Sequence, residues 1–302
     1  MTPERRRQLA YMMLVTTPAL WAVNYLVARA APDIIAPHML AFWRWSLAGL
    51  LLHALSWREI LERRQAIATE WPQFLVLGAL GMWICGAFVY IGGRTTTATN
   101  ISLIYALSPV LIALASTLVV GERLRLAQIA GVAVSLAGFL HIVLRGRWGD
   151  IASVQLTPGD WWILVAAVSW AFYTLLMKRW PSAFGTTARL ALITSGGVLV
   201  LLPFTIVEVF FLSSEVSWRS VGYIVAVALS PAFGAYLSYS FMLRELGAAR
   251  AGVVLYLGPV YVAGLAWMVL GEPVRTFHWV GAALILPGIY LVTRTQKEDR
   301  VD

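Results

Sequence analysis

The chain has 302 residues, of which 60% are apolar and only 13% are charged, and its mean hydropathy is +0.75. These values exclude a water-soluble domain as the body of the protein. The net charge of +8 is spread along the chain and forms no basic domain, so nucleic-acid binding is not expected. The composition predicts a protein embedded in a lipid bilayer.

Apolar runs fill almost the whole length, and about 20 helical residues cross the ~30 Å hydrocarbon core of a membrane. Continuous apolar runs predict helices, because the strands of a membrane barrel would show short alternating segments. The expected fold is an all-α membrane protein with ten transmembrane helices. In chain order the predicted spans are 9–29, 38–56, 72–93, 97–120, 124–144, 160–178, 187–212, 219–243, 249–270 and 276–293.

The basic residues predict the orientation of these spans. With the N-terminus in the cytoplasm, the basic clusters at 5–7, 58–64, 123–125 and 294–300 all fall on the cytoplasmic face. The outer loops then hold fewer basic residues, namely Arg94, Arg145, Arg147, Arg219 and Arg275. Both termini are therefore expected in the cytoplasm.

Residues 98–138 have a second copy about 150 residues later, at 248–288. Pro109 matches Pro259, the Gly-Glu pair at 121–122 matches that at 271–272, and two later glycines match as well. Because each copy belongs to a unit with an odd number of spans, the second unit enters the membrane upside down. The sequence predicts two inverted five-helix repeats, residues 1–149 and 150–302, which is a signature of transporters.

The duplicated segments, together with TPALWAVNYLVARA at 17–30 and AFWRWSLAGLLL at 41–52, resemble the EamA-type members of the drug/metabolite transporter superfamily. The resemblance covers almost the whole chain. It implies a multi-pass protein of a bacterial inner membrane that exports amino acids, aromatic ones among them, or related small metabolites by alternating access. Both repeats lie in one chain, so a monomer is sufficient and a dimer is the alternative.

Polar and aromatic residues inside the spans are the candidates for substrate binding, because an unpaired polar group is costly in hydrocarbon. Trp21, Asn24 and Tyr25 share one face of the first span, and Trp170 and Tyr173 share a face of the sixth, which begins the second repeat. These patches predict two half-sites that face each other. The alternative is that the rings only pack between helices or sit at the membrane interface.

Four further residues are predicted to line the same cavity. They are Trp83 and Tyr90 of the third span, Asn100 of the fourth and Tyr239 of the eighth. For Asn100, an interhelical hydrogen bond is an equally weighted alternative.

Pro109 and Pro259 lie near the middle of their spans, where a missing N–H group bends a helix, and they are predicted to act as hinges of a gate. A static kink is the alternative. The fifth and tenth spans carry small residues that favour close packing, either as a scaffold or as a dimer contact. These residues are Gly131, Ser135, Gly138, Gly281 and Gly288.

Charges inside the spans are few. Arg44, in the second span, is expected to snorkel to the surface or to make a structural hydrogen bond, in preference to binding a substrate carboxylate. Glu122, Glu208 and Glu272 fall at span ends, so no carboxylate is expected near the membrane centre.

The small four-helix drug antiporters of the same superfamily carry a carboxylate in their first span, and residues 9–29 contain none. Zwitterionic or neutral metabolites are therefore favoured over cationic drugs, whose export is the alternative function.

An intramembrane enzyme is the other class considered. The four histidines are separated in the sequence, and no HExxH, GxSxG or CxxC motif is present, so neither catalysis, a metal nor a cofactor is expected. Cys85 is the only cysteine, which excludes an internal disulfide.

Overall fold

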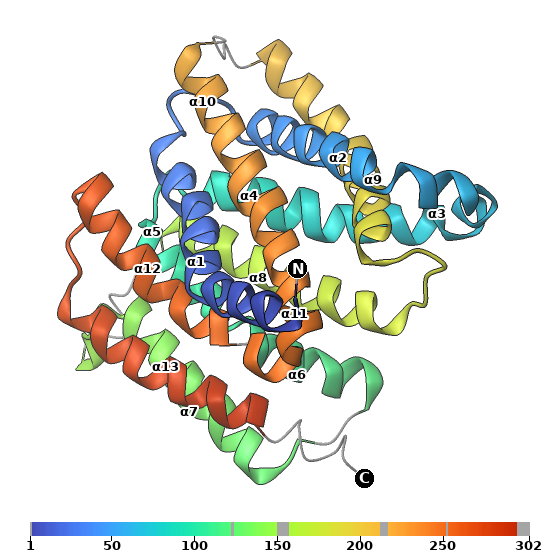
Figure 1. The fold of residues 1–302 in the computed structure, drawn as a ribbon. Coiled ribbons are helices and arrows are strands. Elements are labelled where there is room, and N and C mark those ends of the chain that lie inside the picture. Colours follow the sequence, from blue (N-terminus) through green and yellow to red (C-terminus); the bar gives the residue numbers. More distant parts are fainter. Residues whose placement is uncertain (1, 122–123, 150–156, 212–216, 252, 295–302) are drawn as a thin grey trace.

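The computed structural model describes residues 2–121, 124–149, 157–211, 217–251 and 253–294, and the regular elements in these ranges are helices (Figure 1). The all-α class is confirmed. In chain order the helices are α1 (Pro3–Ala30), α2 (Pro37–Glu62), α3 (Arg64–Gly78), the π-helical η1 (Ala79–Ile84), α4 (Cys85–Gly92), α5 (Ala98–Ala106), α6 (Ser108–Val120), α7 (Leu126–Val143), α8 (Pro158–Arg179), α9 (Thr186–Phe211), α10 (Trp218–Val227), the π-helical η3 (Ala228–Gly234), α11 (Ala235–Ala251), α12 (Val253–Leu270) and α13 (Thr276–Arg294).

Seven helical runs in the described part of the chain are long and apolar enough to cross a membrane. Two shorter apolar helices, Leu257–Leu270 and Thr276–Val292, follow them. α2 also has the length of a span, and it carries Arg44 and His53 within its apolar stretch. The chain is a multi-pass membrane protein, and the count of ten spans stays a prediction.

Helix ends differ from the predicted span ends where the helix continues past its apolar part. α2 runs on to Glu62 and α3 begins at Arg64, whereas the sequence predicted a span end at 56 and a span start at 72. Hydropathy marks the part of a helix that lies in hydrocarbon, and charged helix formers extend it into water. The predicted and observed ends agree more closely where the helix has a cap. Thr157 is the N-cap of α8, its hydroxyl accepts from the Asp160 amide, and Pro158 follows as the first helical residue.

The third span of each predicted repeat contains a π-helical segment, η1 in the first and η3 in the second. The two segments are separated by about 150 residues, the same offset that relates the duplicated motifs. π-Helical turns occur often at functional sites. The irregularity was not expected from the sequence.

The two equivalent prolines have different surroundings. The fourth span is interrupted at Leu107, and Pro109 lies in the first turn of α6, where its missing N–H group is not needed. Helix α12 runs through Pro259 without interruption.

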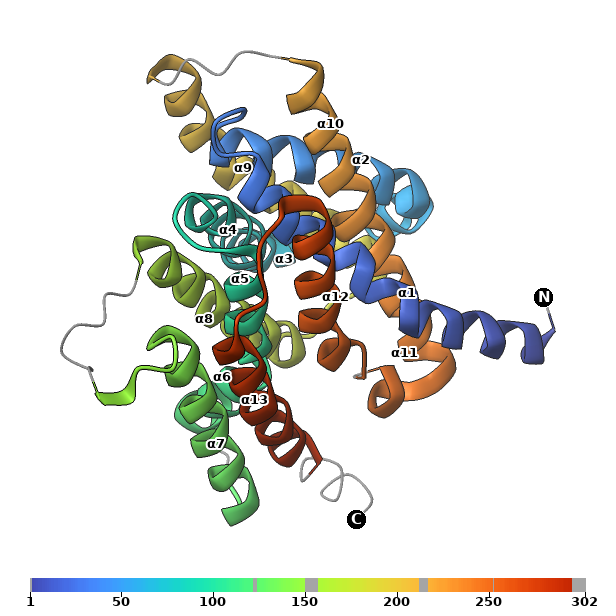
Figure 2. The ribbon, with the colours of Figure 1, turned by 90° about the vertical axis from the view of Figure 1, so that its left-hand side faces the viewer.

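Helices α7 and α13 lie side by side, and close glycine contacts between the two halves join them (Figures 1 and 2). A Cβ atom added to Gly131 would lie 2.6 Å from the Gly288 carbonyl oxygen, and one added to Gly138 would lie 2.9 Å from that of Gly281. Because 131 meets 288 and 138 meets 281, the helices run antiparallel. Shifting each residue number by 150 exchanges the two contacts, so this packing has an internal two-fold relation.

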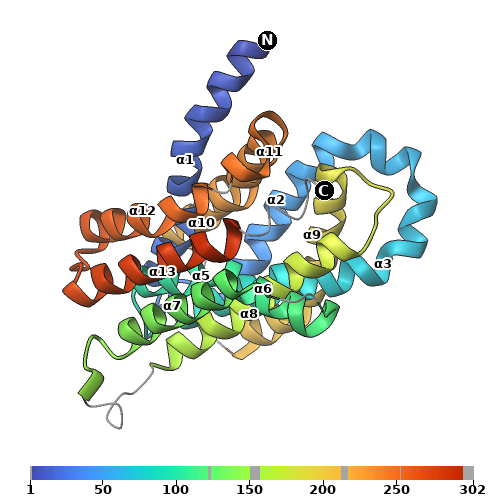
Figure 3. The same cartoon turned by 90° about the horizontal axis from the view of Figure 1, so that it is seen from below.

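The first helix of each predicted repeat packs against the third and fourth spans of the other. α1 contacts α11 and α12, while α8 contacts α4, α5 and α6. α2 lies beside α9, and the first turns of α1 extend beyond the rest of the bundle (Figure 3). This exchange of first helices places both half-sites at the interface of the two halves.

Candidate functional site

A cavity of about 190 Å³ lies in the middle of the bundle. Its walls come from α1, α2, η1, α4, α5 and α6 of the first half and from α8, η3, α11, α12 and α13 of the second. The site therefore lies between the two halves, and its volume suits a molecule smaller than the ~300–1,000 Å³ pockets of drug-sized ligands.

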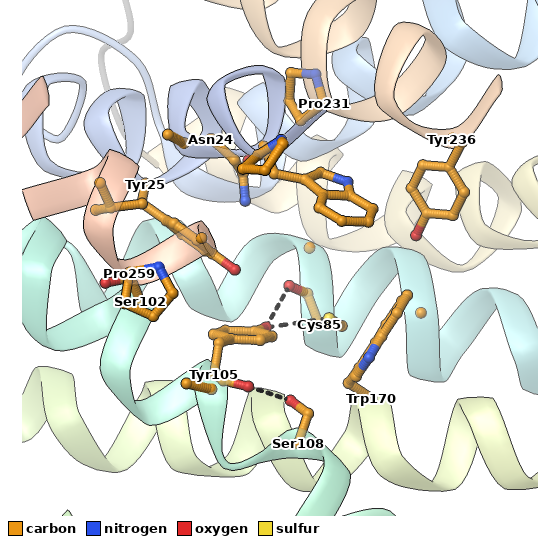
Figure 4. A pocket seen from close by; sticks show the side chains of 18 of the residues that line it. Asn24, Tyr25, Cys85, Ser102, Tyr105, Ser108, Trp170, Pro231, Tyr236 and Pro259 are labelled. Atoms are coloured by element: carbon orange, nitrogen blue, oxygen red, sulfur yellow. Dashed lines mark hydrogen bonds between the residues drawn. The ribbon is translucent and has the colours of Figure 1, made fainter. Parts of the chain in front are cut away.

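Aromatic rings form opposite walls of this cavity. Figure 4 shows Tyr25 and Tyr236, from α1 and α11, approaching from one side, with Tyr105 and Trp170, from α5 and α8, on the other. The ring centres of Tyr25 and Tyr105 are 5.6 Å apart. Such walls bind apolar groups by contact area and ammonium groups through their π faces.

Arg44 supplies the positive charge of the cavity. Its side chain is only 6% exposed, and its Nη1 atom donates to Asn24 Oδ1 at 2.8 Å and to the Tyr90 hydroxyl at 3.1 Å. Tyr90 in turn donates to Asn24 Oδ1 at 2.9 Å. Of the two roles expected for Arg44, the structure shows the structural hydrogen bond and not snorkelling, because α1 and α4 supply its hydrogen-bond acceptors inside the bundle.

Four of the predicted binding residues line the cavity: Trp21, Asn24, Tyr25 and Trp170. Pro109 and Pro259, the predicted hinges, also line it.

Three predicted residues lie directly behind these. Tyr90 bonds to Asn24, Tyr173 stacks on Trp170 with ring centres 5.1 Å apart, and the ring of Tyr239 lies 5.6 Å from that of Trp21. Gly81 makes room for the second pair, because a Cβ atom there would lie 2.8 Å from the Tyr173 ring. These residues support the cavity wall.

Trp83 and Asn100 lie away from the cavity. Trp83 stacks on Phe204 of α9, with ring centres 4.4 Å apart. Asn100 pairs with His278 of α13 at 3.2 Å; because His278 Nδ1 accepts from the Arg275 amide, its Nε2 is the donor to Asn100 Oδ1. Asn100 thus makes the interhelical bond that was its alternative role.

Ser108 and Tyr236, which the sequence also places on cavity-facing stripes of their spans, line the cavity, whereas Arg44, Cys85 and Tyr105 were not predicted as binding residues. A sequence signal exists for Tyr105. Pro109 cannot donate to the carbonyl of Tyr105, one turn earlier, and the Ser108 hydroxyl donates to that carbonyl at 2.6 Å instead. A Ser-Pro pair inside a span, one turn after a tyrosine, is therefore a sequence signal for this break in the helical hydrogen bonds.

The acidic side chains lie at the ends of the bundle, as expected for Glu208 and Glu272. Glu272 accepts from the Ala98 amide at 3.1 Å and pairs with Arg29 Nε at 3.4 Å, while Arg29 donates to the Gly93 carbonyl. Desolvation raises the pKa of Glu272, and the bonds from Ala98 and Arg29 oppose this rise. The network joins the end of α1, the α4–α5 loop and the α12–α13 loop.

Two further carboxylates stabilise the same end of the bundle. Glu208 pairs with His38 Nδ1 at 2.7 Å and accepts two amides of the first turn of α2, and Asp160 accepts the Thr96 hydroxyl at 2.5 Å. Glu122 lies outside the described residues. In the part of the chain that the structure describes, no group of three or more potential ligands could hold a metal ion.

A small cavity between two related halves of a multi-pass membrane protein is the architecture of a secondary transporter. Comparison with known families agrees. The EamA-like transporter family matches residues 8–144 and again residues 157–294, and the chain belongs to this family.

Individual relatives are similar over nearly their full length. An uncharacterized transporter of Archaeoglobus fulgidus is 28% identical over 289 residues, which cover 95% of this chain and 98% of that protein. A probable terminal-alkyne amino-acid exporter of Streptantibioticus cattleyicolor is 27% identical over 287 residues, covering 94% of this chain and 93% of that protein. One crystal structure shares the fold, with a TM-score of 0.63 and 21% identity over 96% of this chain and 98% of that one.

Proposed function

We propose that this protein exports amino acids or related small metabolites across the bacterial inner membrane. The observation that carries the proposal is the cavity between the two halves, where aromatic walls surround a polar group formed by Asn24 and Arg44. An amino acid needs these two surfaces, one for its side chain and one for its charged backbone groups. The similarity to an amino-acid exporter supports the same substrate class.

The proposed mechanism is alternating access by two inverted five-helix units, residues 1–149 and 150–302, with ten spans and both termini in the cytoplasm. The exchanged packing of α1 and α8 supports it, because rocking of one unit against the other changes the walls of the shared cavity. Trp21, Asn24, Tyr25 and Trp170 are proposed to contact the substrate. Tyr90, Tyr173 and Tyr239 hold these side chains in place.

Counterflow in liposomes tests this proposal. Purified protein is reconstituted, the vesicles are loaded with one unlabelled amino acid, and uptake of the labelled form is measured with and without a pH gradient. We expect saturable uptake that depends on internal substrate and exceeds that of protein-free vesicles. If no amino acid supports counterflow under either condition, the substrate class is wrong, and nucleosides, sugars and cationic compounds are the next probes.

A further inference from the structure

Arg44 is a buried charge that forms no ion pair with the residues that the structure describes. Among the described residues that line the cavity, it is the only one with a formal charge, since the others are apolar, aromatic or neutral polar. Its guanidinium carbon lies 4.5 Å from the centre of the Trp45 ring, which stabilises the cation without neutralising it. A buried ion in this setting favours a ligand of opposite charge.

The guanidinium group also has unused donors. Nη1 is bound to Asn24 and Tyr90, whereas Nε is buried with no hydrogen-bond partner and Nη2 makes no hydrogen bond to the described residues. Nε and Nη2 form the edge of an arginine that pairs with both oxygens of a carboxylate. The buried indole N–H of Trp45, beside Arg44 in the same wall, likewise has no hydrogen-bond partner in the part of the chain that the structure describes.

From these donors we infer that Arg44 binds the carboxylate of the transported molecule; the inference rests on the proposed function and gives its substrate a required chemical group. Tyr90 is a positioning residue, and the Oδ1 atom of Asn24 has the same effect, because both fix Nη1 and leave the other edge of the guanidinium group free. The aromatic walls then receive the rest of the molecule, including an ammonium group if present. The site takes zwitterions and carboxylates and discriminates against cations.

Cys85 provides a test that does not depend on the identity of the substrate. It lines the same cavity and is the only cysteine of the chain, so thiol reagents report the charge of the cavity. The probes are anionic sulfonatoethyl methanethiosulfonate and cationic trimethylammonioethyl methanethiosulfonate. The rate at which each reagent modifies Cys85 is divided by its rate with free 2-mercaptoethanol, which corrects for the different reactivity of the two reagents. The anionic value is then divided by the cationic value, and the thiolate fraction of Cys85 cancels in this ratio.

We expect the anionic reagent to be favoured by about tenfold or more in the wild-type protein, as a single unscreened charge nearby predicts. Arg44→Gln should abolish this preference, whereas Arg44→Lys should keep it because it keeps the charge. Arg94→Gln, which removes a charge from an exposed loop, is the matched control and should change nothing. A wild-type protein without anionic preference, or a preference that survives in Arg44→Gln, would overturn the inference.

A ligand series separates this inference from the proposed function. Phenylalanine, 3-phenylpropanoate and phenethylamine share one ring and differ in their charged groups, and their inhibition of Cys85 modification measures binding. We expect the two carboxylates to protect and the amine not to, with protection weakened about 30-fold or more in Arg44→Gln, as when one partner of a buried charge pair is removed. Protection by the amine alone refutes the role of Arg44. If the carboxylates protect Cys85 but no amino acid supports counterflow, amino-acid export is refuted and Arg44 remains the carboxylate site.

Discussion

Replacing Gly288 by alanine tests one of the close contacts between the two halves. The added methyl group would lie 2.2 Å from Ser135 Oγ and 2.6 Å from the Gly131 carbonyl oxygen. Relief requires α7 and α13 to separate, because the second contact is with backbone, and such overpacking costs about 1–3 kcal/mol. Alanine regains about 0.5–1 kcal/mol of helix propensity. The net expectation is a loss of up to about 2.5 kcal/mol.

Two other helical glycines provide matched controls. A Cβ atom at Gly222 in α10 or at Gly264 in α12 has no neighbour within 4 Å, so alanine there should keep the propensity gain of about 0.5–1 kcal/mol. Thermal unfolding in detergent, followed by tryptophan fluorescence, should place Gly288→Ala below the wild type and both controls at or above it. If Gly288→Ala unfolds with the controls, the close packing within the chain is wrong, and the glycine faces become available for a dimer.

Three other changes probe the cavity and its ends. Trp170→Ala should lower counterflow per folded protein about tenfold, the effect of ~1.4 kcal/mol, and Trp83→Ala should lower it less; equal losses would move the site. Burial raises the pKa of Glu272 while the loops around it are packed together. Glu272 therefore stabilises the packed loops at pH values below its pKa in the unpacked loops, and this stabilisation is lost as the pH rises through the raised pKa. Spin-label distances between loops 31–36 and 271–275 should therefore lengthen with rising pH, and Glu272→Gln should remove the change; identical pH profiles would contradict this. Pro109→Ala should slow transport more than Pro259→Ala, at unchanged folded yield, because only Pro109 follows a helix break. The measurement is the initial rate of transport in liposomes, and the reverse order of the two rates would refute the prediction.

The class of fold could be predicted because it depends on composition and on a duplication that a single sequence displays. The positions of side chains around the cavity depend on helix rotation, which the sequence encodes less directly. Trp83 and Tyr90 share a face only if the third span has 3.6 residues per turn, and Trp83 lies inside the π-helical η1, which changes that register. As a result Tyr90 reaches Asn24 while Trp83 packs against α9.

The hydrogen-bond partners of Arg44 could not be predicted for a different reason. Whether a charged residue in a span snorkels or stays buried depends on partners that come from other helices, here Asn24 of α1 and Tyr90 of α4. Both partners were predicted as substrate ligands from their own helices, without the third member that connects them. Proximity between helices far apart in sequence is what the structure adds.

The two halves are equivalent in their scaffold and different in their chemistry. The glycine contacts of α7 with α13 exchange under the repeat offset, and Trp21 and Trp170 line the cavity from the first helix of each half. The charged group has no such counterpart, because Arg44 is the only charged residue among those described that line the cavity. In the proposed mechanism the symmetric scaffold allows two conformations of similar energy, which the internal two-fold axis relates to each other. A single arginine then holds the substrate carboxylate to the same unit in both, so the substrate keeps one orientation while the opposite wall moves past it.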